Sequence, residues 1–173
     1  MAQHERALAF CAAPSKALDV GCGSSGRIID RLLARGFAVE GLDLSPRMVE
    51  LAQQRHPQVT FHLADLCEWL APDSYGFVSA WDSLWHVPLE QHERVLTKLL
   101  SWLEPGGVCV FTMGGLPHAE EKTDAAMGPK MYYSTLGVPR TLALIEAAGC
   151  LCRHLEYDQY PEPHLYLIVQ RSP

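Results

Sequence analysis

Four aspartates stand at or just after the ends of short apolar segments, a placement that could gather them into one site. They are Asp19, Asp43, Asp65 and Asp82. Successive members are separated by about one strand–helix unit, so the parallel strands of an α/β domain would bring all four to the same edge of one sheet. Clustered carboxylates repel each other unless a polar or cationic ligand offsets their charge. The pattern therefore predicts a ligand-binding site at the carboxyl ends of the strands.

The glycine-rich segment that begins at Asp19 is the second feature with chemical meaning. Residues 19–26 read DVGCGSSG, and glycines in such a segment allow a tight turn and a close approach of a ligand to the backbone. Gly21, Gly23 and Gly26 satisfy the GxGxxG pattern of dinucleotide-binding folds, with Asp43 placed to bind a ribose. A nicotinamide-dependent oxidoreductase is therefore one interpretation. Asp19 argues against it, because a carboxylate directly before the glycines suits a cationic amino group and repels a pyrophosphate.

The apolar pattern alternates between short strands and amphipathic helices. Strands are expected at residues 16–20, 37–42, 59–64, 77–81, 108–113, 150–157 and 164–170. Helices are expected at residues 27–35, from Pro46 onwards, at 88–103 and at 139–148. Residues 158–163 are too few for a helical crossover, so the last two strands should pair antiparallel. We expect a single α/β domain over residues 1–173, with a doubly wound, seven-stranded, mostly parallel Rossmann-like sheet and one antiparallel strand near the C-terminus.

Four segments resemble, in order and in register, the motifs of the class I S-adenosylmethionine-dependent methyltransferases. Residues 17–23 (ALDVGCG) resemble the first motif, 41–48 (GLDLSPRM) the motif of the second strand, 64–66 (ADL) the adenine-binding step, and 103–107 (LEPGG) the turn before the fifth strand. The resemblance extends from about Lys16 to the end of the chain. It departs at Ser25, where the family usually has the third glycine of GxGxG, so the turn around the methionine moiety is expected to differ in shape. Such motifs are informative about fold and cofactor but not about the acceptor.

The resemblance implies how S-adenosylmethionine, and its product S-adenosylhomocysteine, would be held. Asp19 would lie near the methionine end, and Gly21 and Gly23 would let the backbone approach it. Asp43 would accept hydrogen bonds from both ribose hydroxyls.

The adenine ring would be held by the second and third strand ends. Leu44 and Met48 would pack against it, and Asp65 would accept a hydrogen bond from its exocyclic amine. Without the motif, ordinary core packing would be the better interpretation of Leu44 and Met48. The predicted cofactor-binding residues are Asp19, Gly21, Cys22, Gly23, Asp43, Leu44, Met48, Asp65, Leu66 and Trp81.

Residues 81–88 (WDSLWHVP) resemble a stretch of small-molecule members of the family and are expected to line the acceptor pocket. Methyl transfer from a sulfonium depends on proximity and alignment, and a general base is needed only when the acceptor must lose a proton. His86 is the candidate base or acceptor-orienting residue, since histidine titrates near neutral pH. A bond to a backbone carbonyl that fixes the loop is its alternative role. Trp85, His86 and Tyr133 are the predicted acceptor-binding residues, although one of Trp81 and Trp85 is expected in the core.

Two further segments carry polar residues near the predicted site. Residues 114–137 show weak periodicity and are long enough for a functional loop or lid, in which the charges of residues 120–122 should be solvated. Asp158, Glu162 and His164 flank the last turn and are expected to be solvated charges on an edge hairpin. The segment before the first strand is short for a cap in this family. A pocket that it leaves open would fit a bulky acceptor, or completion by a second subunit of a homodimer.

The composition limits the partners. The 173 residues carry a net charge of -6 without a run of Lys or Arg, so a nucleic-acid acceptor is not expected. No apolar run reaches the roughly 18 to 20 residues of a membrane span, and the N-terminus lacks the layout of a secretory signal. Six scattered cysteines without a CxxC pair are typical of reduced thiols in the cytoplasm, and no metal site is expected.

The sequence thus predicts a cytoplasmic methyltransferase acting on a small molecule. The oxidoreductase alternative explains only the glycines and Asp43. A catalytically silent S-adenosylmethionine-binding protein is the other alternative, and Trp81, Asp82 and His86 argue against it.

Overall fold

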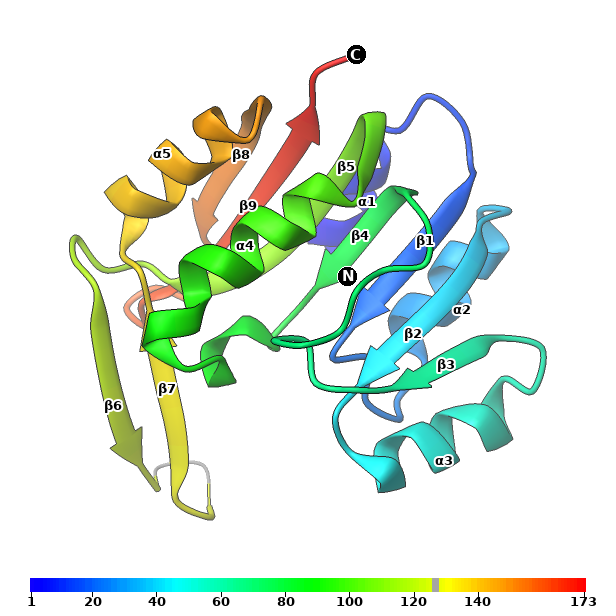
Figure 1. Cartoon of the computed structure of the whole chain (residues 1–173), viewed down its shortest axis with the longest axis horizontal. Helices are drawn as coiled ribbons and strands as arrows, with labels where there is room; N and C mark the ends of the chain where they lie inside the picture. Colours follow the sequence, from blue (N-terminus) through cyan, green and yellow to red (C-terminus); the bar gives the residue numbers. More distant parts are fainter. Residues whose placement is uncertain (126–127) are drawn as a thin grey trace.

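A seven-stranded sheet runs through the molecule in the order β3-β2-β1-β4-β5-β9-β8 (Figure 1). This computed structural model describes residues 1–125 and 128–173. The strands are β1 (Lys16–Val20), β2 (Ala38–Asp43), β3 (Thr60–Leu63), β4 (Tyr75–Ala80), β5 (Leu103–Gly114), β8 (Cys150–Tyr157) and β9 (His164–Arg171). The first five pair in parallel, and β9 is antiparallel to both β5 and β8. The predicted fold class, with one antiparallel strand near the C-terminus, is confirmed.

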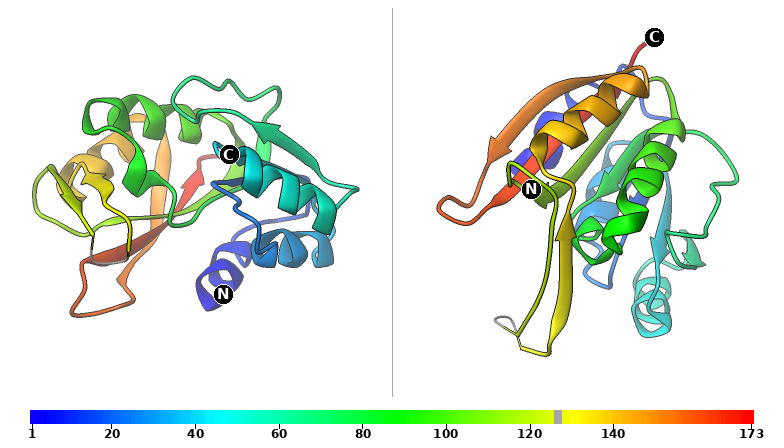
Figure 2. Two further views of the ribbon diagram at one scale, coloured as in Figure 1. Left: turned by 90° about the horizontal axis from the view of Figure 1, so that it is seen from below. Right: turned by 60° about the vertical axis from the view of Figure 1, so that its left-hand side comes forward.

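The two faces of the sheet are covered by different helices (Figure 2). Helices α1 (Ala2–Leu8) and α2 (Arg27–Ala34) lie on one face, and α4 (His92–Ser101) and α5 (Val138–Ala147) on the other. Helix α3 (Pro46–Arg55) packs against β2 and β3. Successive side chains of a strand point to opposite faces, so Ala17 belongs to one apolar core and Leu18 to the other.

Gly26, the third glycine of the sequence pattern, serves helix packing. It caps the N-terminus of α2 with φ 66°, a conformation that glycine adopts without steric cost. A Cβ at this position would stand 2.4 Å from the ring of His56, which follows α3. Gly26 therefore lets α2 and the end of α3 approach closely. The departure from the family pattern at Ser25 leaves Gly21 and Gly23 in the turn itself.

The region predicted as one helix over residues 88–103 is divided. A single 3-10 turn, η2 (Leu89–Gln91), precedes α4, and the helix ends at Ser101. Leu103 then pairs with Tyr75, while the next paired residue, Val108, lies opposite Phe77. Residues 104–107, expected to form the turn before the fifth strand, thus form a bulge inside β5, because the strand already begins at Leu103.

The segment expected to be a loop or lid contains a two-stranded antiparallel hairpin. Its strands are β6 (Glu120–Asp124) and β7 (Met131–Thr135), and Figure 1 shows the hairpin extending away from the main sheet. Most side chains of β6 are exposed, so the strand has no buried face. The alternation of apolar and polar residues that marks a half-buried strand is therefore missing. Residues 126 and 127 of the predicted loop lie outside the described residues.

Candidate functional site

The strand order reverses between β1 and β4, so the carboxyl ends of these strands form the switch point at which α/β sheets bind ligands. Asp19 lies in β1 and Asp43 ends β2, while Asp65 and Asp82 follow β3 and β4. Because these strands are parallel, all four aspartates lie at the same edge, as the sequence predicted.

The glycine turn after β1 is bound to the end of β2 by three backbone groups. The N–H groups of Gly21 and Cys22 donate to the Leu42 carbonyl over 2.7 and 3.1 Å, and the Gly23 N–H donates to Asp43 Oδ2 over 2.8 Å. A Cβ on Gly21 would stand only 2.4 Å from Ser83 Cβ. The turn therefore requires glycine here and brings the segment after β4 directly against it.

Asp19 is 2% exposed and lies in a buried hydrogen-bonded chain. It shares a hydrogen bond with Ser79, whose hydroxyl is 3.2 Å from Nε2 of His4 on α1. Burial raises the pKa of Asp19 to about 7; the bond to Ser79 lowers it and the charge of Asp43 raises it. A nearby cation would favour the charged form of this carboxyl group.

Apolar side chains stand exposed beside the carboxylates at the ends of β2 and β3. Leu44 is 67% exposed and Leu63 is 54% exposed. Leu44 is thus not a core residue, whereas Met48 is half-buried on α3. Asp65 Oδ1 accepts a hydrogen bond from the Cys67 N–H at 2.8 Å. The edge offers an apolar surface between polar groups, which fits a flat ring with polar substituents.

Asp43 lies at the centre of this arrangement. Its Oδ2 accepts from the Gly23 N–H, and its Oδ1 accepts from the Ser45 N–H at 2.9 Å. A carboxylate oxygen can accept more than one hydrogen bond, so Asp43 keeps acceptor capacity for a ligand hydroxyl.

The predicted acceptor residues come from two elements. His86, in the 3-10 turn η1 (Leu84–His86), donates from Nδ1 to the Tyr132 carbonyl at 2.9 Å, and its ring lies 5.3 Å from the Tyr133 ring. The hairpin strand β7 is thus tied to the segment after β4. This bond matches the loop-fixing role of His86 and leaves Nε2 for a ligand.

The two tryptophans after β4 both pack against His164. The Trp85 ring stacks on His164 with centroids 5.7 Å apart, and its Nε1 donates to Thr112 Oγ1 at 3.2 Å. The Trp81 ring lies 5.9 Å from His164 and 4.9 Å from His4. Trp81 thus packs towards α1 and β9, and its contact with the cofactor stays a prediction.

The expectation that the charges at the last turn are solvated was wrong for His164 and Asp158. Their side chains are 12% and 7% exposed, and His164 Nδ1 bonds Asp158 Oδ1 at 2.5 Å. His164 Nε2 lies 3.0 Å from Asp82 Oδ1. Because β9 is antiparallel, its first residue pairs with Gly114, the last residue of β5. The start of β9 therefore reaches the ligand-binding edge, and the predicted antiparallel pairing was the signal for it.

A model of a methyltransferase domain matches residues 17–107, which span the glycine turn and the first four strands. The chain belongs to the class I S-adenosylmethionine-dependent methyltransferases. It is 34% identical to a trans-aconitate 2-methyltransferase from Methylobacterium radiotolerans, over 86% of this chain and 55% of that protein. The chain spans about half the length of that curated relative.

Solved structures share the fold of this family member. A 1,6-didemethyltoxoflavin-N1-methyltransferase from Burkholderia thailandensis has a TM-score of 0.78 at 19% identity, over 99% of this chain and 77% of that one. An S-adenosylmethionine-dependent methyltransferase from Mesorhizobium loti has a TM-score of 0.78 at 20% identity, over 99% and 98%. At these identities the likeness concerns the fold.

Lys98 is a residue of this family member that the sequence analysis missed. Its Nζ donates to the carbonyls of Leu66, Cys67 and Trp69 over 2.6, 3.0 and 2.9 Å, and lies 5.6 Å from the centroid of the Trp102 ring. Burial lowers the pKa of Lys98. The ammonium of α4 thus fixes the loop that follows Asp65. A lysine on an amphipathic helix carries no sequence signal for this role.

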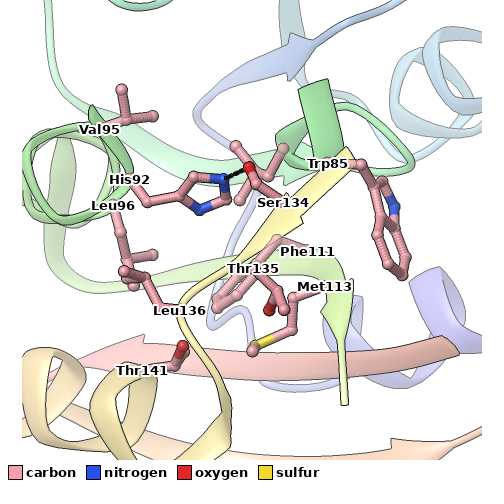
Figure 3. Close-up of a pocket in the computed structure, with 11 residues that line it drawn as sticks. Trp85, His92, Val95, Leu96, Phe111, Met113, Ser134, Thr135, Leu136 and Thr141 are labelled. Atoms are coloured by element: carbon pink, nitrogen blue, oxygen red, sulfur yellow. Dashed lines mark hydrogen bonds between the residues drawn. The ribbon is translucent and has the colours of Figure 1, made fainter. Parts of the chain in front are cut away.

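A small cavity lies among α4, α5, β5 and β7 (Figure 3). Most of its lining is apolar, with Phe111 and Met113 from β5. His92 Nε2 lies 2.8 Å from Ser134 Oγ, and the Ser134 hydroxyl donates to the Val87 carbonyl. These bonds anchor the base of the hairpin to α4.

Two searches of the described part of the chain bear on other site classes. No helix there is both long and apolar enough to cross a membrane. Within the same residues, no group of three or more His, Cys, Asp or Glu side chains could hold a metal ion.

Proposed function

We propose that this chain transfers the methyl group of S-adenosylmethionine to a small-molecule acceptor at the carboxyl edge of β1, β2 and β4. The observation that carries the proposal is the buried Asp19 behind a glycine turn whose Gly23 N–H is bound to Asp43. A carboxyl group in this position suits the cationic methionine end and disfavours a pyrophosphate. Bound there, S-adenosylmethionine would supply an electrophilic methyl group on a positively charged sulfur.

The residues at this edge fit the cofactor in three parts. Asp19, Gly21, Cys22 and Gly23 would surround the methionine moiety, and Asp43 would accept hydrogen bonds from the ribose hydroxyls. For the adenine ring, the proposed contacts are Leu44, Met48, Asp65 and Leu66, with Leu63 added from its exposure. Trp81 would complete the set from the end of β4. Burial, followed by the charges of Asp19 and Asp43, raises the pKa of the Cys22 thiol to about 12, so Cys22 would act by packing.

The acceptor would bind between the segment after β4 and the hairpin. Trp85 and Tyr133 would line this space, and His86 Nε2 would orient the acceptor or accept its proton. Alignment of the acceptor with the methyl group would provide most of the acceleration. A homodimer that completes the pocket remains part of the proposal, as do the cytoplasmic location and the exclusion of nucleic acid as acceptor.

Thermal unfolding with S-adenosylhomocysteine and with NAD separates the proposal from the oxidoreductase alternative. A ligand that binds only the folded state at about 100 times its Kd adds roughly 2.7 kcal/mol, which corresponds to about 5–10 °C in Tm for a domain of this size. We expect this shift with S-adenosylhomocysteine and none with NAD. A shift with NAD alone would refute the proposal.

Variants of Asp43 show whether the shift comes from the predicted site. Asp43→Ala should abolish it. Asp43→Asn, which keeps an acceptor for the Gly23 N–H, should reduce it while the protein stays folded. Glu90→Ala, at an exposed position outside the proposed site, is the control and should shift like the parent protein. Methylation of any member of a metabolite panel would then exclude a silent binding protein.

A further inference from the structure

Asp82 carries a carboxylate that the fold holds in one orientation after β4. Its backbone has φ 52°, a region that aspartate tolerates better than most residues. The Asp82 N–H donates to Thr112 Oγ1 over 2.8 Å, and the Thr112 hydroxyl donates back to Asp82 Oδ1 over 3.2 Å. His164 Nε2 donates to the same oxygen. Oδ2 has no hydrogen-bond partner among the residues that the structure describes, and the Asp82 side chain is 56% exposed.

Two carboxylates, those of Asp82 and Asp158, bond the ring of His164. Burial lowers the pKa of His164, but the bonds to Asp82 and Asp158 and their charges outweigh burial and raise it above its ordinary value. Because each ring nitrogen of His164 faces a carboxylate oxygen, which only accepts hydrogen bonds, both nitrogens donate, and two carboxylates face one imidazolium. In the described part of the chain, no Lys or Arg forms an ion pair with these three side chains. His4, the nearby group on α1, is neutral at pH 7, because burial and then the N-terminal ammonium lower its pKa to about 4. That ammonium is a further cation near these groups.

The free oxygen of Asp82 belongs to the segment that touches the cofactor turn. The next residue, Ser83, is the one that a Cβ on Gly21 would strike. On the other side of Asp82, Thr112 and His164 come from β5 and β9. Asp82 therefore stands between the glycine turn and two residues, Thr112 and His164, that also contact Trp85, a proposed acceptor-binding residue.

We propose that Asp82 is a catalytic residue and that the acceptor is an amine, an inference that rests on the proposed methyl transfer. The neutral amine nitrogen attacks the methyl carbon of the sulfonium. The N–C bond forms as the C–S bond breaks, and the sulfur keeps the bonding electron pair. Positive charge passes from sulfur to nitrogen, and the product is an N-methylammonium ion, with no proton moved in this step.

The fixed carboxylate stabilises the charge that develops on the nitrogen. Oriented groups that need no rearrangement during the reaction are effective at this task, and Thr112 and His164 provide that orientation for Asp82. A carboxylate acceptor would instead place a second negative charge beside Oδ2 and be repelled. The site should therefore discriminate between an amine and an otherwise similar acid.

Matched acceptor pairs test the substrate class. Transfer of labelled methyl from S-adenosylmethionine is measured with phenethylamine and 3-phenylpropionate, tryptamine and indole-3-propionate, and glucosamine and glucuronate. We expect methylation of at least one amine, at roughly 100 times or more the rate of its matched acid. Faster methylation of an acid, or no methylation of any amine, overturns the inference.

A variant of Asp82 tests its role with the amine that reacts. Asp82→Asn keeps an oxygen for Thr112 and His164 but removes the charge, so kcat should fall roughly 100-fold while the affinity for S-adenosylhomocysteine stays within about twofold. Glu162→Gln, on the exposed turn before β9, should leave both unchanged. Unchanged kcat in Asp82→Asn overturns the catalytic role. If the parent protein did not bind S-adenosylhomocysteine, the proposed function itself would be refuted instead.

Discussion

At the scale of single residues, the burial of the Asp19 carboxyl group costs stability above its ordinary pKa. The fold removes its carboxyl group from water, and burial raises its pKa from 3.8 to about 7. Between these pH values the folded chain holds a proton that the unfolded chain has lost. The free energy of unfolding therefore falls as pH rises through this window, and the full cost is present above pH 7.

Asp19→Asn should therefore stabilise the ligand-free protein. Asparagine carries no charge to desolvate, so the gain at pH 8 should approach about 4 kcal/mol, the cost of a shift of about three pKa units. The gain should be small near pH 4, where the folded carboxyl group is protonated and the pH has barely passed the unfolded pKa of 3.8. Urea unfolding at the two pH values measures it. An equal effect of the substitution at both would contradict the ionisation argument.

The same variant should bind the cofactor less tightly. A cationic amino group favours the ionised form of Asp19, so affinity for S-adenosylhomocysteine in the parent protein should rise between pH 6 and 8. Asp19→Asn should lose this rise. Calorimetric titration over this range provides the measurement, and a rise that persists in the variant would assign it to another group.

At the scale of elements, α4 holds the loop after Asp65 in place through the side chain of Lys98. Three carbonyls of the loop after Asp65 accept from its ammonium. Lys98→Met removes these bonds while keeping the length of the side chain, and should weaken S-adenosylhomocysteine binding roughly tenfold, since each bond to a charged donor contributes about 1.5–3 kcal/mol before relaxation of the loop.

A merely structural role for Lys98 would give a different result. Lys98→Arg should restore part of the binding, and Lys98→Met should raise the KM for S-adenosylmethionine more than it lowers kcat. Thr97→Val, on the exposed side of α4, is the control. A loss of stability with unchanged affinity in Lys98→Met would show that the loop keeps its shape without the lysine.

The elements that could be predicted from the sequence are those with a buried face. Strand β1 was predicted at its exact bounds because Ala17 and Leu18 belong to cores on opposite faces. The hairpin β6–β7 was not, since its exposed side chains give no periodic pattern. Among the site residues, sequence spacing placed the four aspartates at one edge. It could not place His164 beside Asp82, because that contact depends on the register of β9 against β5.

At the scale of the whole molecule, α1 contributes both to one apolar core and to the edge that carries the site. On the face that α1 and α2 share, α2 packs against β1 and β2, and α1 packs against β5. The short helix α1 also reaches the site, because Gln3 donates to Asp158 and His4 bonds Ser79. This helix of seven residues thus supports both the sheet and the side chains of Asp158 and Ser79.

Leu8→Ala measures how much the molecule relies on α1. Leu8 is 5% exposed in the core that includes Val110 and Ile168. Its truncation should lower the free energy of unfolding by about 2–4 kcal/mol and the Tm by roughly 5–10 °C.

Leu70→Ala, at a leucine that is 75% exposed, is the control and should change the free energy of unfolding by less than about 0.5 kcal/mol. Both are compared by urea unfolding, in which an unchanged m-value identifies a pure stability effect. If the two variants were equally mild, α1 would not pack against β5 in solution, and the positions of Gln3 and His4 at the site would lose their support.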